Sequence, residues 1–325
     1  MMAESHILYA YEFDGQGGAT KLEGDAIAQK IKDDSLAWVH FNVDHDDTRE
    51  WLAKEASYLD PLILDALLEE ETRPRITEYP EGFLIILRGV NLNDDAREED
   101  MVSIRLWIDP HRIISTRRRK LRAVVHIRER LEAGKGPKNS ADFLSTLVSR
   151  LIGNMEPVLI HLDDDTDQIE EDILGEPDMD HRKAINQIRK KAIILRRYIA
   201  PQKEAISYLM ASDIPWITPQ NMRQFRESHD KMTRYIEDLD AIRDRSQVIK
   251  DELANILSDR MNKNLYVLSL IAALFLPLGF LTGLLGINVG GMPGVESELA
   301  FWAVCALCIV VLGFEYVLFR WLRWL

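Results

Sequence analysis

Cysteine is nearly absent from this chain of 325 residues, which contains only two, Cys305 and Cys308. Both lie in one apolar run near the C-terminus, so the preceding part of the chain has no disulfide framework and no cysteine zinc finger. The two thiols are one helical turn apart and could bind a soft metal, but packing of small side chains between helices is the favoured interpretation. This cysteine usage is typical of a reducing compartment.

Motifs of nucleotide binding and of covalent catalysis are also missing. The glycine-rich segment 133–138 lacks the Gly-x-x-x-x-Gly-Lys-Ser/Thr spacing of a phosphate-binding loop, and the sequence shows no Ser/His/Asp or Cys/His constellation. We therefore expect neither an enzyme nor a resident cofactor. The N-terminus lacks the basic, apolar and small-residue layout of a signal peptide, so we expect the residues before Leu265 to stay in the cytoplasm.

Positive charge is in deficit, because 40 Lys and Arg face 53 Asp and Glu and the formal net charge is −13. So acidic a chain argues against nucleic acid as a partner, whereas it would concentrate cations near a membrane pore. The basic cluster 117–120 is accordingly interpreted as a charged junction between a strand and a helix.

Two long uncharged runs are present, and each is long enough to cross a bilayer. Residues 265–285 and 299–319 each contain about 21 residues, or roughly 32 Å of helix. Glu315 is the one acid in these runs, and reaching the inner headgroups is favoured over a role as a buried proton carrier. The connecting loop 286–298 has no Lys or Arg, so the positive-inside rule predicts that both termini, including the tail 320–325, lie in the cytoplasm.

The region before the first run divides into a mixed part and a helical part. Residues 1–139 alternate between strand-like and helical patterns, which predicts a mixed sheet flanked by helices. The strand patterns are at 6–13, 36–43, 82–90, 101–108 and 112–116, and the helical ones at 24–32, 47–57, 61–69 and 120–131. The fold class predicted is thus an α+β membrane protein with an N-terminal cytoplasmic α/β domain.

Residues 140–218 are predicted to form a helical hairpin. Its first arm, 140–174, is acidic and kinked at Pro157, and its second arm, 180–210, is basic, so opposite charges would favour pairing of the arms. A stalk helix, 219–264, then continues into the first span as one helix about 100 Å long. Its narrow apolar stripe predicts packing against identical helices around a pore axis.

The C-terminal spans carry a resemblance to a known family. The first span closes in Gly286-Ile287-Asn288, a short outside loop follows, and the chain ends in a basic and aromatic tail. This arrangement resembles the CorA family of metal-ion transporters, whose signature is Gly-Met-Asn. The segment 289–294, VGGMPG, is similar to the zinc-transporting ZntB branch of that family.

The resemblance implies a homopentamer in the bacterial inner membrane that passes Zn²⁺, and related ions such as Cd²⁺, Ni²⁺ and Co²⁺, through a pore surrounded by membrane lipid. Gly286, Ile287 and Asn288 would form the selective outer mouth, and Glu296 and Glu298 would attract cations. Alignment on the signature places one helical face along the axis: Gly279, Leu276, Ala272, Leu268, Leu265, Met261, Ser258 and Asp251.

Alternatives remain open for the cargo and for a second metal site. Ile287 in place of Met favours zinc over a CorA-type magnesium or cobalt channel, and a metal sensor that does not transport is the alternative from another class. Membrane potential favours uptake over efflux, with proton linkage open. His161, Asp164 and Asp165 share one helical face and suit a metal, although a solvated acidic face is the favoured interpretation.

Overall fold

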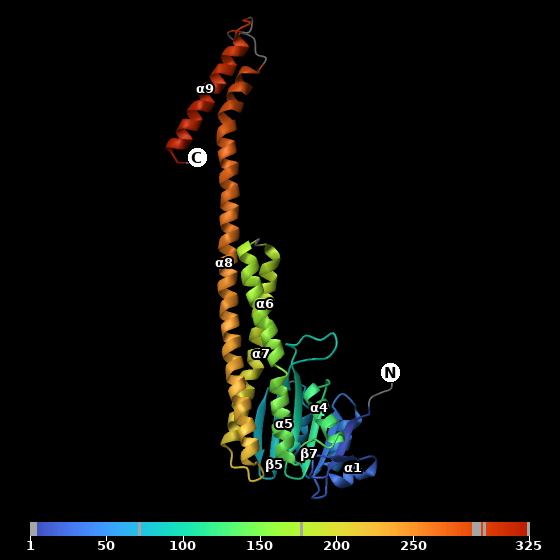
Figure 1. Cartoon of the computed structure of the whole chain (residues 1–325). Coiled ribbons are helices and arrows are strands. Elements are labelled where there is room, and N and C mark those ends of the chain that lie inside the picture. The colour runs from blue at the N-terminus through green and yellow to red at the C-terminus, as the bar shows by residue number, and fades with distance from the viewer. Residues whose placement is uncertain (1–4, 71–72, 176–177, 288–293, 295–296, 324–325) are drawn as a thin grey trace. The chain divides into compact units, whose positions relative to one another are not determined.

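The structure, a computed structural model, is shown in Figure 1. It describes residues 5–70, 73–175, 178–287, 294 and 297–323. These residues form two compact units, Met1–Lys250 and Asp251–Leu325, and the long helix α8 (Pro219–Leu285) contributes to both. The predicted fold class is confirmed, because an α/β region is followed by helices, by α8 and by a second apolar helix, α9 (Ala300–Trp321).

A seven-stranded mixed sheet forms the centre of the first unit, in the order β2-β1-β3-β7-β6-β5-β4. Strands β3 and β7 are parallel, and the other neighbouring pairs are antiparallel. Strand β6 is buried along its whole length, as expected for a strand covered on both faces. The strands are β1 (Ile7–Phe13), β2 (Ala19–Lys21), β3 (Ala37–Asn42), β4 (Arg75–Tyr79), β5 (Gly82–Gly89), β6 (Val102–Ile108) and β7 (Arg112–Arg117).

Five of these strands match the predicted segments, and the two that the sequence patterns missed, β2 and β4, are the edges of the sheet. Strand β2 has three residues, and neither edge strand contains a fully buried residue. An edge strand packs on fewer neighbours, so it needs less of the apolar alternation on which prediction depends.

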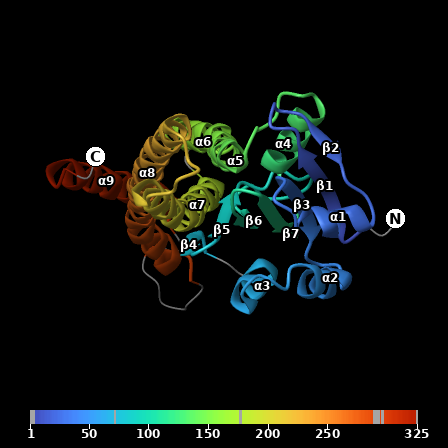
Figure 2. The ribbon, with the colours of Figure 1, turned by 90° about the horizontal axis from the view of Figure 1, so that it is seen from below.

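Helices cover both faces of the sheet. Figure 2 shows α2 (Asp47–Glu55) and α3 (Pro61–Leu68) on one side, and α4 (Arg122–Glu132) and α5 (Ser140–Gly153) on the other. Helix α1 (Asp25–Lys30) shares the core beneath α2 and α3. Helix α3 begins cleanly because the Asp60 carboxylate accepts a hydrogen bond from the Leu62 N–H at 2.8 Å and Pro61 follows as the first helical residue.

The first arm of the predicted helical hairpin is two helices. Helix α5 ends at Gly153, and α6 (Glu156–Gly175) begins three residues later. The predicted kink at Pro157 is therefore wrong: Pro157 lies in the first turn of α6, where its missing N–H leaves no intrahelical bond unmade. Helix α7 (Met179–Ala211) forms the second arm and contains Pro201 in its interior.

The N-terminal part of α8 packs within its own chain. Phe225, Met232, Leu239, Ile242 and Ile249 belong to the apolar stripe and are all buried in the single chain. The expectation that identical helices would bury this part of the stripe is therefore wrong. Ion pairs confirm which helices lie beside it, because Arg196 of α7 contacts Asp240 of α8 at 2.7 Å.

Opposite charges also pair differently from the prediction. The acidic side chains of α6 form ion pairs with Arg245 of α8: Asp163 at 3.3 Å, and Asp167 and Glu170 at 2.5 Å each. The hydrogen bonds that the Arg245 guanidinium donates to Glu170 and Asp167 raise its pKa above the ordinary value. Part of the acidic face that the sequence assigned to pairing with the basic arm thus pairs with Arg245 of α8 instead.

Candidate ion-conduction segment

The second unit consists of the C-terminal part of α8 together with α9. Each helix contains an apolar window with mean hydropathy of 2.3, of which 0% is buried for α8 and 6% for α9. Large apolar side chains are exposed along both helices, for example Leu276 at 75% and Phe280 at 69%. A soluble chain does not leave so much contiguous apolar surface in water, so both helices are suited to a hydrocarbon environment.

The eight predicted pore positions all lie on α8 and are exposed in the single chain: Asp251, Ser258, Met261, Leu265, Leu268, Ala272, Leu276 and Gly279. Steps of three, four and seven residues keep these positions on one helical face. Other residues of the same helix, such as Phe280, are equally exposed. Exposure therefore leaves this face free for a pore or for lipid, and its role as a pore lining stays a prediction.

The predicted outer mouth begins where α8 ends. Gly286 directly follows the last helical residue, and its N–H donates to the Gly283 carbonyl at 3.2 Å. A Cβ at Gly286 would lie 3.0 Å from the Thr282 carbonyl oxygen, so close approach of backbone explains the glycine. Ile287 is exposed. Asn288 and Glu296 lie outside the described residues, and Glu298 is exposed.

Glu315 of α9 is placed differently from the prediction. Its side chain is only 6% exposed, and neither of its carboxylate oxygens has a hydrogen-bond partner among the described residues. The expectation that this carboxylate reaches the headgroups is therefore wrong for the single chain. A buried acid in an apolar helix is an arrangement typical of proton-carrying groups in transporters.

The predicted metal ligands on α6 are not brought together. His161, Asp164 and Asp165 are all exposed. His161 and Asp165 line a small cavity of about 10 Å³ whose other charged lining residues are Glu98, Glu99 and Lys191. The ammonium group of Lys191 supplies positive charge beside these acids, which lowers the attraction for a metal cation.

A cluster of metal-ligating side chains that the sequence patterns missed lies in the first unit. Among the described residues, His6, His45 and Asp47 each offer one ligand atom within 4.8 Å of the other two. His6 lies nearly forty positions from the other two, so spacing along the chain carried no signal. Pairing of β1 with β3 brings them together, since Ile7 lies opposite Phe41.

Two exposed apolar helices after a large α/β region define the class of the protein: an integral membrane protein that carries most of its mass outside the bilayer. A model of the family described as CorA-like Mg²⁺ transporter protein matches residues 33–321. Divalent cation transporter CmaX of Pseudomonas aeruginosa is 37% identical over 329 residues, which cover 99% of this chain and 98% of CmaX.

Zinc transport protein ZntB of Yersinia enterocolitica is 35% identical over 320 residues, which cover 98% of this chain and 95% of ZntB. The structure of the full-length CmaX protein matches with a TM-score of 0.84 and 35% identity and covers 100% of both chains. The chain therefore belongs to the CorA family of metal-ion transporters. It is a divalent cation transporter and not an enzyme.

Proposed function

We propose that the protein is a zinc transporter that works as a homopentamer in the bacterial inner membrane. The observation that carries this proposal is the likeness to ZntB along 98% of the chain, which includes both apolar helices. Ile287 supports it, because a stiff aliphatic side chain replaces the thioether of the family signature at the outer end of α8. The same pore is proposed to pass Cd²⁺, Ni²⁺ and Co²⁺.

The proposed pore is lined by α8. Between Met261 and Leu276 the predicted axial face is apolar, so five copies would form a constriction that closes by dewetting. Ser258 and Asp251 continue this face toward the cytoplasm, where Asp251 would form a ring of carboxylates. The apolar face is exposed in one chain, which supports burial against other copies on assembly.

The proposed domain boundaries follow the same topology. The cytoplasmic part comprises the α/β domain 1–139, the helical hairpin 140–218 and the stalk 219–264. Spans 265–285 and 299–319 flank a periplasmic loop, 286–298, and the tail 320–325 returns to the cytoplasm. Support comes from α8, which ends at Leu285, and from α9, which begins at Ala300.

Asn288 is proposed to meet the hydrated cation at the outer mouth. An amide carbonyl can accept hydrogen bonds from the water shell of a divalent ion without displacing the waters. Glu296 and Glu298 would raise the local cation concentration. To test this, zinc flux into proteoliposomes is compared between wild type, Asn288→Ala and Asn186→Ala, which removes an exposed amide of α7 outside the membrane-spanning helices. We expect flux to fall for Asn288→Ala alone, and unchanged flux in that variant would refute the role of Asn288.

Uptake is the proposed direction. A potential of about 100 mV, negative inside, favours entry of a divalent cation by about 4.6 kcal/mol. The buried carboxylate of Glu315, for which the described part of the chain offers no hydrogen-bond partner, supports proton linkage. Glu315→Gln should remove any dependence of zinc flux on an imposed pH gradient, whereas Glu298→Gln should leave that dependence intact.

A second candidate is a magnesium channel. It is favoured because the description of the matching family names Mg²⁺ transport. Competition between Mg²⁺ and Zn²⁺ in the flux assay separates the two candidates. A metal sensor without transport is the third, and reconstituted protein that conducts no divalent ion would favour it.

A further inference from the structure

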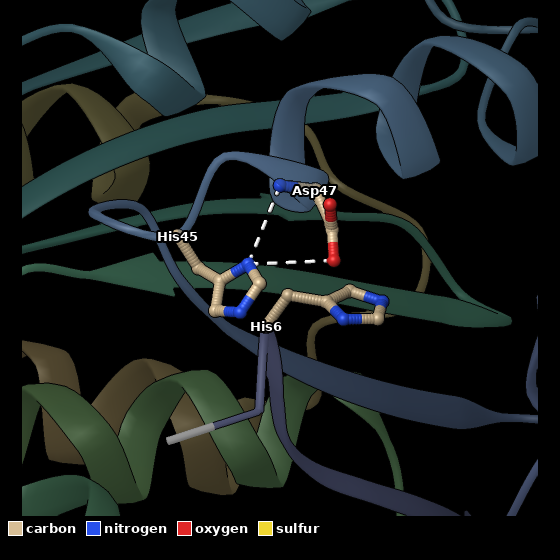
Figure 3. A group of neighbouring side chains, drawn as sticks. All are labelled: His6, His45 and Asp47. Atoms are coloured by element: carbon tan, nitrogen blue, oxygen red, sulfur yellow. Dashed lines mark hydrogen bonds and ion pairs between the residues drawn. The ribbon is translucent and has the colours of Figure 1, made fainter. Parts of the chain in front are cut away.

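We propose that His6, His45 and Asp47 form a zinc-class metal site in the α/β domain, outside the transport pathway. Figure 3 shows the two imidazole rings and the carboxylate close together, with His6 directly before β1, His45 in the turn before α2 and Asp47 as the first residue of α2. The ring centroids of the histidines are 5.7 Å apart, and the planes are inclined by 49°. The site goes beyond the proposed function, because it binds metal whether or not the pore conducts.

The distances are close to those of a coordinated ion. Nδ1 of His45 lies 3.6 Å from Oδ2 of Asp47. Ligand atoms at about 2.0–2.1 Å from a tetrahedral zinc ion are about 3.4 Å apart, so this pair needs almost no movement. All three ligand atoms lie within 4.8 Å of one another. Side-chain rotations that move the ligand atoms by about 1 Å would bring them to the spacing found around a zinc ion.

The nitrogen of His45 that faces the carboxylate is available to a metal. It accepts a hydrogen bond from the Asp47 N–H at 3.3 Å, which is longer than the usual 2.7–3.2 Å, so a metal would displace only a weak bond. On His6, Nε2 is buried and has no hydrogen-bond partner among the residues that the structure describes. Asp47 is 65% exposed in its side chain, which leaves a path for the ion and for a water as fourth ligand.

The backbone holds the ligands in position before any metal binds. The Asn42 N–H donates to the His6 carbonyl at 2.9 Å and fixes the start of β1 against the end of β3. The Thr48 hydroxyl donates to the Asn42 carbonyl at 2.5 Å, and the Thr48 N–H donates to the His45 carbonyl at 3.0 Å. The turn that carries His45 and Asp47 is thus closed at both ends, which reduces the ordering needed on binding.

The ligand types select the metal. Two imidazoles and one carboxylate suit Zn²⁺, Co²⁺ or Ni²⁺, whereas Mg²⁺ prefers an octahedral shell of oxygen ligands. Three protein ligands with an open fourth position differ from the closed four-ligand sites that are structural. The geometry therefore points to an exchangeable ion of the zinc class.

Titration of the full-length protein in detergent with ZnCl₂, followed by calorimetry, tests the site. We expect His6→Ala and His45→Gln each to weaken one zinc-binding event per chain by at least about 10-fold, since loss of a direct ligand exceeds the effect of outer-shell changes. Asp47→Asn should weaken it as well. The matched controls, His111→Ala and Asp46→Asn, change an exposed histidine and the neighbouring carboxylate, and they should bind as wild type does. Millimolar MgCl₂ should not compete.

A second measurement uses wild-type protein, so its result does not depend on whether the histidine variants fold. Chemical modification of histidine, mapped by mass spectrometry, should be slowed by Zn²⁺ at His6 and His45 and unaffected at His111. Asn288→Ala should show the same protection, which separates this site from the proposed pore. Equal modification of His6 and His45 with and without Zn²⁺, or unweakened binding in both histidine variants, would overturn the proposal.

Discussion

Acid should destabilise the α/β domain through one buried histidine, His40 of β3. This side chain is fully buried between strands, its ring stacks on Tyr9 at 5.6 Å between centroids, and its Nδ1 lies 2.8 Å from the Ser115 hydroxyl. Burial lowers the pKa of His40 to about 3, and the positive charge of Arg117 adds to the shift. The folded protein therefore keeps His40 neutral at pH values where an unfolded chain would protonate it.

The sign and size of the effect follow from linkage. Between pH 6.5, the ordinary pKa of histidine, and about pH 3, the unfolded state binds one proton more than the folded state, so stability falls as the pH falls. Above pH 6.5, His40 is neutral in both states and contributes nothing to the dependence of stability on pH. At pH 4.5 the loss is about 3 kcal/mol, and it levels off at about 5 kcal/mol below pH 3. Such a loss is a substantial part of a typical stability of about 5–15 kcal/mol.

Native-state hydrogen exchange of the full-length protein in detergent, read from peptides of β3 and β7, measures this effect. The opening free energy of wild type should decrease between pH 7 and pH 4.5, whereas His40→Gln, which cannot protonate, should show a decrease smaller by about 2–3 kcal/mol. His111→Gln serves as the control at an exposed position and should retain the wild-type slope. An unchanged slope in His40→Gln would refute this reasoning.

Three further predictions concern packing, charge and the pore. Phe143→Ala removes a buried ring that packs edge-on against Trp38, with 5.0 Å between ring centroids. It should lower the free energy of unfolding, measured in denaturant, by about 3–5 kcal/mol. The control Leu62→Ala, at an exposed site, should lower it by about 0.5 kcal/mol or less. Arg245→Gln should lower it by at most about 1 kcal/mol, because these ion pairs are partly exposed, and added salt should shrink the difference between variant and wild type. Leu276→Ala should raise zinc flux several-fold by widening an apolar ring, while Leu274→Ala, two positions from both Ala272 and Leu276 and thus on the opposite side of the helix, should not; lower flux in Leu276→Ala would contradict the gate.

Regular apolar periodicity allowed much of the fold to be predicted from the sequence. The long helix α8 was predicted to within one residue at its start, because its stripe runs without a proline from Gln220 to Pro277. Edge strands β2 and β4 were missed because few of their side chains are buried. The break between α5 and α6 was missed because Met155, which is buried, continues the apolar spacing across it.

Long-range placement was much harder to predict. Periodicity identifies the apolar face of a helix but not the helices that cover it. The stripe of α8 was therefore assigned to packing against other copies of the chain, although α5, α6 and α7 directly precede it in the same chain. Glu315 was assigned to the headgroups from its distance to the end of the run, whereas packing buries it. The cluster of His6, His45 and Asp47 depends on the register of β1 with β3, which no local pattern encodes.

Zinc selectivity of the pore is the central claim, and flux into proteoliposomes under an imposed potential, negative inside, tests it most directly. The purified full-length protein is reconstituted, and entry of Zn²⁺ and of Mg²⁺ is recorded separately and in competition. We predict zinc entry that increases with the potential and persists in excess Mg²⁺. Flux dominated by Mg²⁺, with Zn²⁺ acting only as an inhibitor, would contradict the account.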